Sequence, residues 1–249
     1  MTMRDIQERT LEVARGLQGI TAMLEERRRN FISFRPQVEG PSETAFRITA
    51  VPTRARIRLE RPYERTDLIA VRSWKVPFAD GRTEPLNGTC RWVPRLAPML
   101  RGGRAATSGA KGVAEITVAE NGMVELRSVL AKDSIYIGWL LGDVLHALDI
   151  ADKVRALADQ PEAEYALDIE VGRRRPPGSQ IALDGLGGHL LVDSRFTVTT
   201  PLRLPLYSVE AAGGFPSIAL QVLADMMNAG GMAEDRRATI VPVSNLRQR

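Results

Sequence analysis

Arginines in short clusters are the residues of this sequence whose type and spacing best fit a chemical role. Arg54, Arg56 and Arg58 alternate with apolar residues in RARIRLE, so on a strand their guanidinium groups share one face. A second cluster stands in RRRPPG and consists of Arg173, Arg174 and Arg175. A guanidinium group pairs with phosphate through two parallel hydrogen bonds. The clusters therefore indicate contact with a nucleic acid backbone.

A glycine-rich stretch, GGRAATSGAKG at 102–112, adds further cations to this group. In a phosphate-binding P-loop a lysine directly follows the second glycine, whereas here Ala110 intervenes before Lys111. A nucleotide site is therefore not expected. We interpret the stretch as a loop that touches nucleic acid through Arg101, Arg104 and Lys111.

Asp143, His146 and Asp149 fall three apart on a predicted helix. Neighbouring carboxylates raise the basicity of histidine, so acid–base chemistry or metal binding is one interpretation. The other is a solvated helix face, on which Asp149 and Lys153 form an ordinary i, i+4 pair. A metal site needs three or four converging ligands, and no second histidine or cysteine cluster supplies them. We favour the solvated face and predict no catalytic residue, metal or cofactor, although a site assembled from distant residues stays open.

Charge is distributed unevenly along the 249 residues. Residues 1–111 carry 21 basic and 12 acidic groups, whereas residues 112–170 carry 4 and 12. Such segregation favours either an anionic partner or pairing of the basic part with the chain's own acidic segment or with another subunit. A GC-rich genome is a further explanation for the preference for arginine over lysine.

The clearest predicted helix spans residues 4–34, ahead of the globular part of the chain. Its apolar residues repeat every seven positions and form a seam of Ile6, Thr10, Val13, Leu17, Ile20, Leu24 and Phe31. We divide the chain into an N-terminal amphipathic helix at 1–35, a globular domain at 45–230 and a tail at 231–249. The helix serves either as a brace packed on this chain or as an oligomerisation arm.

Hydrophobic periodicity predicts the remaining elements. Strands are expected at 45–51, 54–60, 67–78 and 164–171, and helices at 134–158 and 215–228. Asn121-Gly122 predicts a type I′ hairpin within 113–130, and DIEV with SQIAL predicts a second hairpin that has RRRPPG at its tip. Residues 91–112 are expected to be largely irregular. The predicted fold class is α+β, with a mostly antiparallel sheet packed against two amphipathic helices and the long N-terminal helix beside it.

Several segments resemble the region that follows a Schlafen-like, Alba-type DNA-binding domain in bacterial proteins. The similar pieces are the apolar seam ending in EERRR at 25–29, the strand FRITAVP at 46–52, YIGWLL at 136–141 and EYALDIEV at 164–171. The resemblance implies a C-terminal accessory module of a nucleic-acid-binding protein, with a role in phage defence. The Schlafen-like domain itself is absent, so the resemblance carries no catalytic residue over to this chain.

Together these features predict a non-catalytic subunit or accessory domain of a bacterial nucleoprotein or antiphage-defence complex. It would contact nucleic acid through its arginine clusters and other protein subunits through the seam of 4–34. The alternative is a protein-interaction scaffold that assembles through this helix without touching nucleic acid. The polar N-terminus, the single cysteine and the apolar stretch interrupted by Asp143, His146 and Asp149 favour a cytoplasmic protein without a membrane span.

Overall fold

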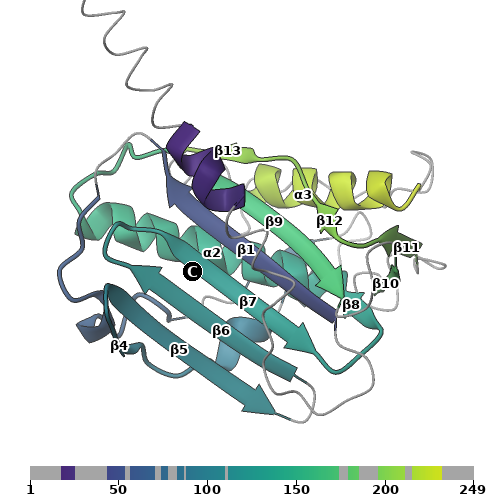
Figure 1. Cartoon of the computed structure of the whole chain (residues 1–249), viewed down its shortest axis with the longest axis horizontal. Helices are drawn as coiled ribbons and strands as arrows, with labels where there is room; N and C mark the ends of the chain where they lie inside the picture. Colours follow the sequence, from purple (N-terminus) through teal and green to yellow (C-terminus); the bar gives the residue numbers. More distant parts are fainter. Residues whose placement is uncertain are drawn as a thin grey trace, which may run out of the picture.

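A large antiparallel sheet is the centre of the fold (Figure 1). The computed structural model describes residues 18–25, 44–53, 57–70, 74–77, 83–86, 88–109, 112–173, 179–184, 196–210 and 215–231. The large sheet has eight strands in the order β12-β9-β1-β7-β6-β5-β4, with β13 also paired to β9. The predicted class, α+β with a mostly antiparallel sheet, is confirmed.

The bounds of these strands are Thr44–Pro52 for β1, Ala97–Met99 for β4, Gly102–Gly109 for β5, Gly112–Ala119 for β6, Val124–Leu130 for β7, Tyr165–Arg173 for β9, Leu202–Arg203 for β12 and Tyr207–Val209 for β13. A three-stranded sheet joins β8 (Ser134–Tyr136), β10 (Gln180–Asp184) and β11 (Phe196–Thr199). A two-stranded sheet pairs β2 (Trp74–Pro77) with β3 (Thr83–Leu86).

Helices cover one face of the large sheet. Figure 1 shows α2 (Ile137–Leu157) behind it, where the helix packs against β1 and β7, and α3 (Phe215–Ala229) packs against α2. Strand alternation explains the contact, because Phe46, Ile48 and Ala50 of β1 point into the helix-side core. The residues between them must point to the opposite face of the sheet.

Helix α2 corrects one prediction about its polar residues. Asp143, His146 and Asp149 are buried, so they do not form a solvated face. The reason is that α2 is covered on several sides, by the sheet, by α3 and by the 3-10 helix η2 (Thr89–Trp92). The predicted Asp149–Lys153 pair is present at 2.8 Å, and Lys153 also donates to the carbonyl oxygens of two residues in the turn at 65–70.

The hairpin predicted at 113–130 is confirmed as β6 and β7, but its turn differs from the predicted type. Gly122 has a φ of 79°, whereas Asn121 is not among the residues with positive φ, so the type I′ geometry is wrong. The amide of Gly122 donates to the carbonyl of Ala119, whose own amide donates to Met123. This is the three-residue loop in which glycine takes the left-handed position.

Three further predictions are wrong. Residues 57–60 form no strand, although their alternation is real: Ile57 and Leu59 are buried and Arg58 is exposed. Residues 91–112 contain β4 and the whole of β5 instead of an irregular loop. The expected hairpin of DIEV and SQIAL does not form, because β9 pairs with β1, β12 and β13, while β10 pairs with β8 and β11.

The N-terminal segment is helical at residues 18–25 within the described part of the chain. Leu24 is buried against Val51 and Met123, and Ile20 packs on the same small cluster. These two seam residues therefore contact the chain's own sheet, as expected for a brace. The rest of the predicted 4–34 helix and nearly all of the 231–249 tail lie outside the described residues.

Candidate nucleic-acid interface

The predicted site residues fall into separate places. Arg58 is exposed on the segment 57–60, and Arg101 and Arg104 are exposed at β4 and β5. Arg173 ends β9, where its backbone lies opposite Thr44, but its side chain is outside the description. Outside the described residues altogether are Arg54, Arg56, Lys111, Arg174 and Arg175.

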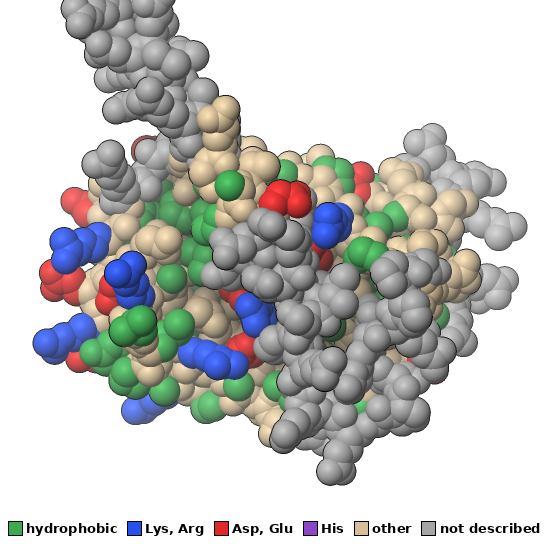
Figure 2. Space-filling view, in the orientation of Figure 1, with side chains coloured by type: hydrophobic (Ala, Val, Ile, Leu, Met, Phe, Trp, Pro, Cys, Tyr) green, Lys and Arg blue, Asp and Glu red, His purple; other side chains and the backbone are tan. Residues whose placement is uncertain are grey.

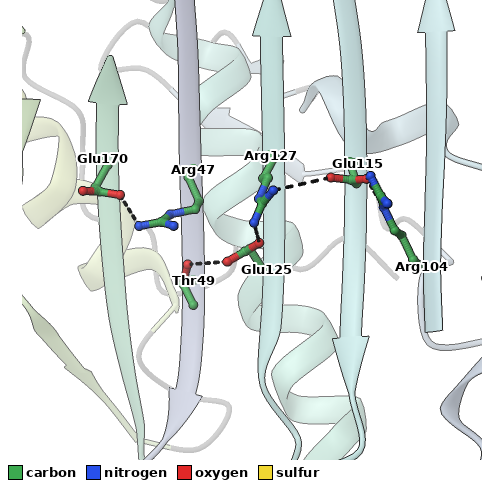
Figure 3. Close-up of polar contacts among 7 residues, drawn as sticks. All are labelled: Arg47, Thr49, Arg104, Glu115, Glu125, Arg127 and Glu170. Carbon is green, nitrogen blue, oxygen red and sulfur yellow. Dashed lines mark hydrogen bonds and ion pairs between the residues drawn. The ribbon is translucent and has the colours of Figure 1, made fainter. Parts of the chain in front are cut away.

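A row of charged side chains, here called the charged belt, crosses the sheet face that points away from α2; Figure 3 shows all of its members except Arg203. From β12 to β5 its members are Arg203, Glu170, Arg47, Arg127, Glu125, Glu115 and Arg104. The row follows from strand register, since Arg47 lies opposite both Glu170 and Arg127, and Arg127 lies opposite Glu115. Opposed side chains on neighbouring strands are close enough to interact directly.

Ion pairs join the members of the belt. Arg47 bonds to Glu170 and Arg104 bonds to Glu115. Arg127 lies 2.6 Å from Glu125 and 4.0 Å from Glu115. Arg47 and Arg127 face each other on neighbouring strands, and each positive charge is neutralised by its own carboxylate, Glu170 or Glu125.

Burial of the central members of the charged belt indicates that these ion pairs stabilise the fold. The Arg47 side chain is only 2% exposed, and burial lowers the pKa of its guanidinium while Glu170 raises it. Arg47 and Arg104 belong to the basic segment 1–111, and their partners Glu170 and Glu115 belong to the acidic segment 112–170. Part of the charge segregation in the sequence therefore reflects pairing inside the fold.

A second group of arginines lies along the β4–β5 side of the sheet and is here called the basic edge. It consists of Arg91, Arg95, Arg101 and Arg104. Residues 85–114 contain these four arginines and Lys111 but no acidic residue. The sequence alone contains this acid-free window, but charge totals over segments as long as 1–111 conceal it.

The strand pairing places the basic edge at one border of the sheet. β4 is the last strand of the order and pairs only with β5 among the described strands, with Ala97 opposite Arg104. Leu96 packs close to Gly103, and Trp92 and Thr107 line one pocket, so residues 92–96 run alongside β5. Figure 2 shows Lys and Arg side chains at the left of the molecule, over β4 and β5, beside hydrophobic and acidic ones. Those acidic residues come from other segments of the chain.

Exposed apolar side chains accompany these arginines. Trp92 is 73% exposed and Leu100 is 95% exposed, and Met99 is also exposed. The Arg91 guanidinium lies 4.5 Å from the centre of the Trp92 ring. Neither Arg95 nor Arg101 has a carboxylate partner among the described residues. An exposed aromatic ring beside arginines is an arrangement that binds single-stranded nucleic acid.

Buried Asp143 of α2 fixes the turn that carries Arg91 and Trp92. Its Oδ1 accepts a hydrogen bond from the Cys90 amide at 3.0 Å, and its Oδ2 accepts from Thr89, which also bonds to Ser128. A Cβ on Gly88 would lie 2.0 Å from Oδ1, so only glycine fits there. Burial raises the pKa of Asp143 to about 6. This carboxylate is therefore a clamp on η2.

His146 is buried as a neutral ring. Burial, together with the nearby charge of Lys153, lowers its pKa to about 4. Within the described ranges no three of the His, Cys, Asp and Glu side chains converge on a point that could hold a metal ion. The Cys90 thiol is buried, and burial raises its pKa, which makes it a weak nucleophile.

Comparisons of the chain with protein-family models, curated proteins and solved structures give no significant match. The resemblance to the Schlafen-associated region therefore stays a prediction. Of the helices that the structure describes, none combines the length and the apolar character needed to cross a lipid bilayer.

Proposed function

We propose that this chain is a non-catalytic, nucleic-acid-binding subunit or accessory domain of a bacterial nucleoprotein complex, and that the basic edge is its contact surface. The observation that carries the proposal is the acid-free window 85–114, which runs along one border of the sheet with Trp92 exposed among its arginines. The resemblance to a Schlafen-associated region favours a role in phage defence.

The ligand that fits this edge is a single strand. The arginines lie on the segments that form the β4–β5 border of the sheet, and such cations bind a backbone that carries one negative charge at regular intervals. Trp92 offers a flat apolar surface on which an unpaired base can stack. A duplex hides the faces of its bases and would leave this ring without a partner.

The charged belt is excluded from this role. Its arginines are already paired with carboxylates, and releasing Arg47 would break a buried ion pair with Glu170, which would keep only the more exposed Arg203 of the belt, at 3.4 Å. Arg104 belongs to both groups, since it pairs with Glu115 while more than half of its side chain stays exposed. It therefore anchors the basic edge to the sheet.

The test removes two charges from the basic edge and leaves the fold intact. Arg95→Gln with Arg101→Gln should weaken binding of a fluorescent single-stranded oligonucleotide and make the salt dependence, log K against log salt, shallower by about 1.4, since each phosphate contact contributes about 0.7. Fluorescence anisotropy measures both quantities at several salt concentrations.

The matched control is Arg61→Gln with Arg65→Gln. These side chains are also exposed, but each already pairs with a carboxylate, Glu64 or Asp67. The control should keep the salt slope of the unmodified protein. Equal losses in the two double variants would show that only overall charge matters, and the basic edge would then have no special role.

A further inference from the structure

A pocket opens beside the basic edge, between η2, the β5–β6 hairpin and the start of α2. Its volume is about 440 Å³, which lies in the range of small-molecule sites. Its lining is mainly apolar and includes Thr89, Arg91, Trp92, Thr107, Ser108 and Trp139. The proposed function does not yet use it.

Two tryptophans in the lining each carry a cation on the ring. The Arg91 guanidinium lies 4.5 Å from the centre of Trp92, and the Lys132 ammonium lies 5.5 Å from the centre of Trp139. Tyr136 packs edge-on against Trp139, with 5.8 Å between the two ring centres, and this contact restrains the Trp139 ring. Aromatic faces together with positive charge favour a ligand that is itself aromatic and anionic.

Hydroxyl groups in the lining are few and come from η2 and from β5. Thr89 lines the pocket, and its hydroxyl is held by Asp143 and Ser128. Thr107 and Ser108 add hydroxyl groups from the end of β5. A small number of fixed polar groups in an apolar wall orients a ligand rather than binding it strongly.

We propose that this pocket holds one base of the single strand whose backbone follows the basic edge. The inference rests on the proposed function, because the strand delivers the base. It is carried by the continuity of the two sites: Arg91 belongs both to the basic edge and to the pocket lining, and Trp92, whose ring lies against Arg91, lines the same pocket. The base enters between Trp92 and Trp139, and the adjoining phosphate lies near Arg91.

The experiment uses intrinsic tryptophan fluorescence of the full chain, titrated with adenosine 5′-monophosphate. Ribose 5-phosphate and inorganic phosphate are the matched probes without a base. The base-containing probe should quench fluorescence, and the other two should not. Quenching by phosphate alone would overturn the inference, because the pocket would then be an anion site only.

Thr107→Phe is the pocket-filling variant. Thr107 lies opposite Ala114, whose side chain is buried, so the added ring projects into the pocket from a strand position that favours aromatic residues. It should abolish quenching by the mononucleotide, weaken oligonucleotide binding by about tenfold, the contribution of one stacked base, and leave the salt slope unchanged. Circular dichroism verifies the fold of the variant.

Trp92→Ala provides a second route if Thr107→Phe fails to fold, since Trp92 is mostly exposed. It should likewise reduce mononucleotide binding without changing the salt slope. Salt-dependent oligonucleotide binding without any mononucleotide quenching would overturn the pocket inference and leave the proposed function standing. Mononucleotide binding without oligonucleotide binding would overturn both, because the base would not come from a strand.

Discussion

Replacing the clamp residue Asp143 by asparagine changes stability in a pH-dependent way that can be worked out from its burial. Burial raises the pKa of this carboxyl from 3.8 to about 6. Between these values the native state binds more protons than the unfolded state, so the free energy of unfolding falls as pH rises. A difference of about 2 pKa units corresponds to about 3 kcal/mol, and the loss is complete about one pH unit above the native-state pKa.

The Asp143→Asn variant cannot titrate at this position. The free energy of unfolding of the variant minus that of the unmodified protein should therefore grow by about 3 kcal/mol between pH 4 and pH 7. Urea denaturation followed by circular dichroism at several pH values measures this difference. Glu120→Gln, which removes a carboxylate from the exposed turn between β6 and β7, controls for the loss of one negative charge. A difference that stays flat or shrinks as pH rises would refute the reasoning from burial.

Three substitutions test the other structural contacts by chemical denaturation. Glu170→Gln should lower the free energy of unfolding by about 3–5 kcal/mol, because it leaves Arg47 buried without its main partner. The double variant with Arg47→Met should lose less than the sum of the two single variants, because the two side chains interact. Strictly additive losses would argue against the ion pair. Arg155→Met should also cost about 3–5 kcal/mol, because the buried guanidinium bonds to Asp152 and to two backbone carbonyls, and a loss under 1 kcal/mol would contradict this. Gly88→Ala should destabilise the protein and weaken oligonucleotide binding, since the added methyl group collides with the clamp carboxylate, and unchanged binding would disconnect the clamp from the site.

The sequence was most informative where one element carries its own periodic pattern. The β6–β7 hairpin and helices α2 and α3 lie within one to three residues of their predicted bounds, because each buries a regular apolar stripe. β5 escaped prediction because GGRAATSG has small residues in place of a hydrophobic alternation, and its strand conformation comes from pairing with β4 and β6. The alternation at 57–60 is real but belongs to an extended segment without strand pairing.

The sequence could not show which strands pair with one another or which charged side chains form ion pairs. EYALDIEV was recognised as a strand, yet its neighbour β1 lies more than a hundred residues earlier in the chain, so the local hairpin was the wrong choice. In the same way Arg47 and Arg104 look like surface cations until the register places Glu170 and Glu115 beside them. Exposed and neutralised arginines can be told apart only once the sheet order is known.

The most direct test of the central claim is the salt dependence of binding between the unmodified protein and a fluorescent single-stranded oligonucleotide. Arg95 and Arg101, the arginines of the basic edge without a carboxylate partner among the described residues, predict a slope of log K against log salt of about −1.4, and therefore binding about sevenfold weaker at about 200 mM than at about 50 mM salt. Absence of binding at the lower salt concentration, or an affinity that does not change with salt, would contradict the account.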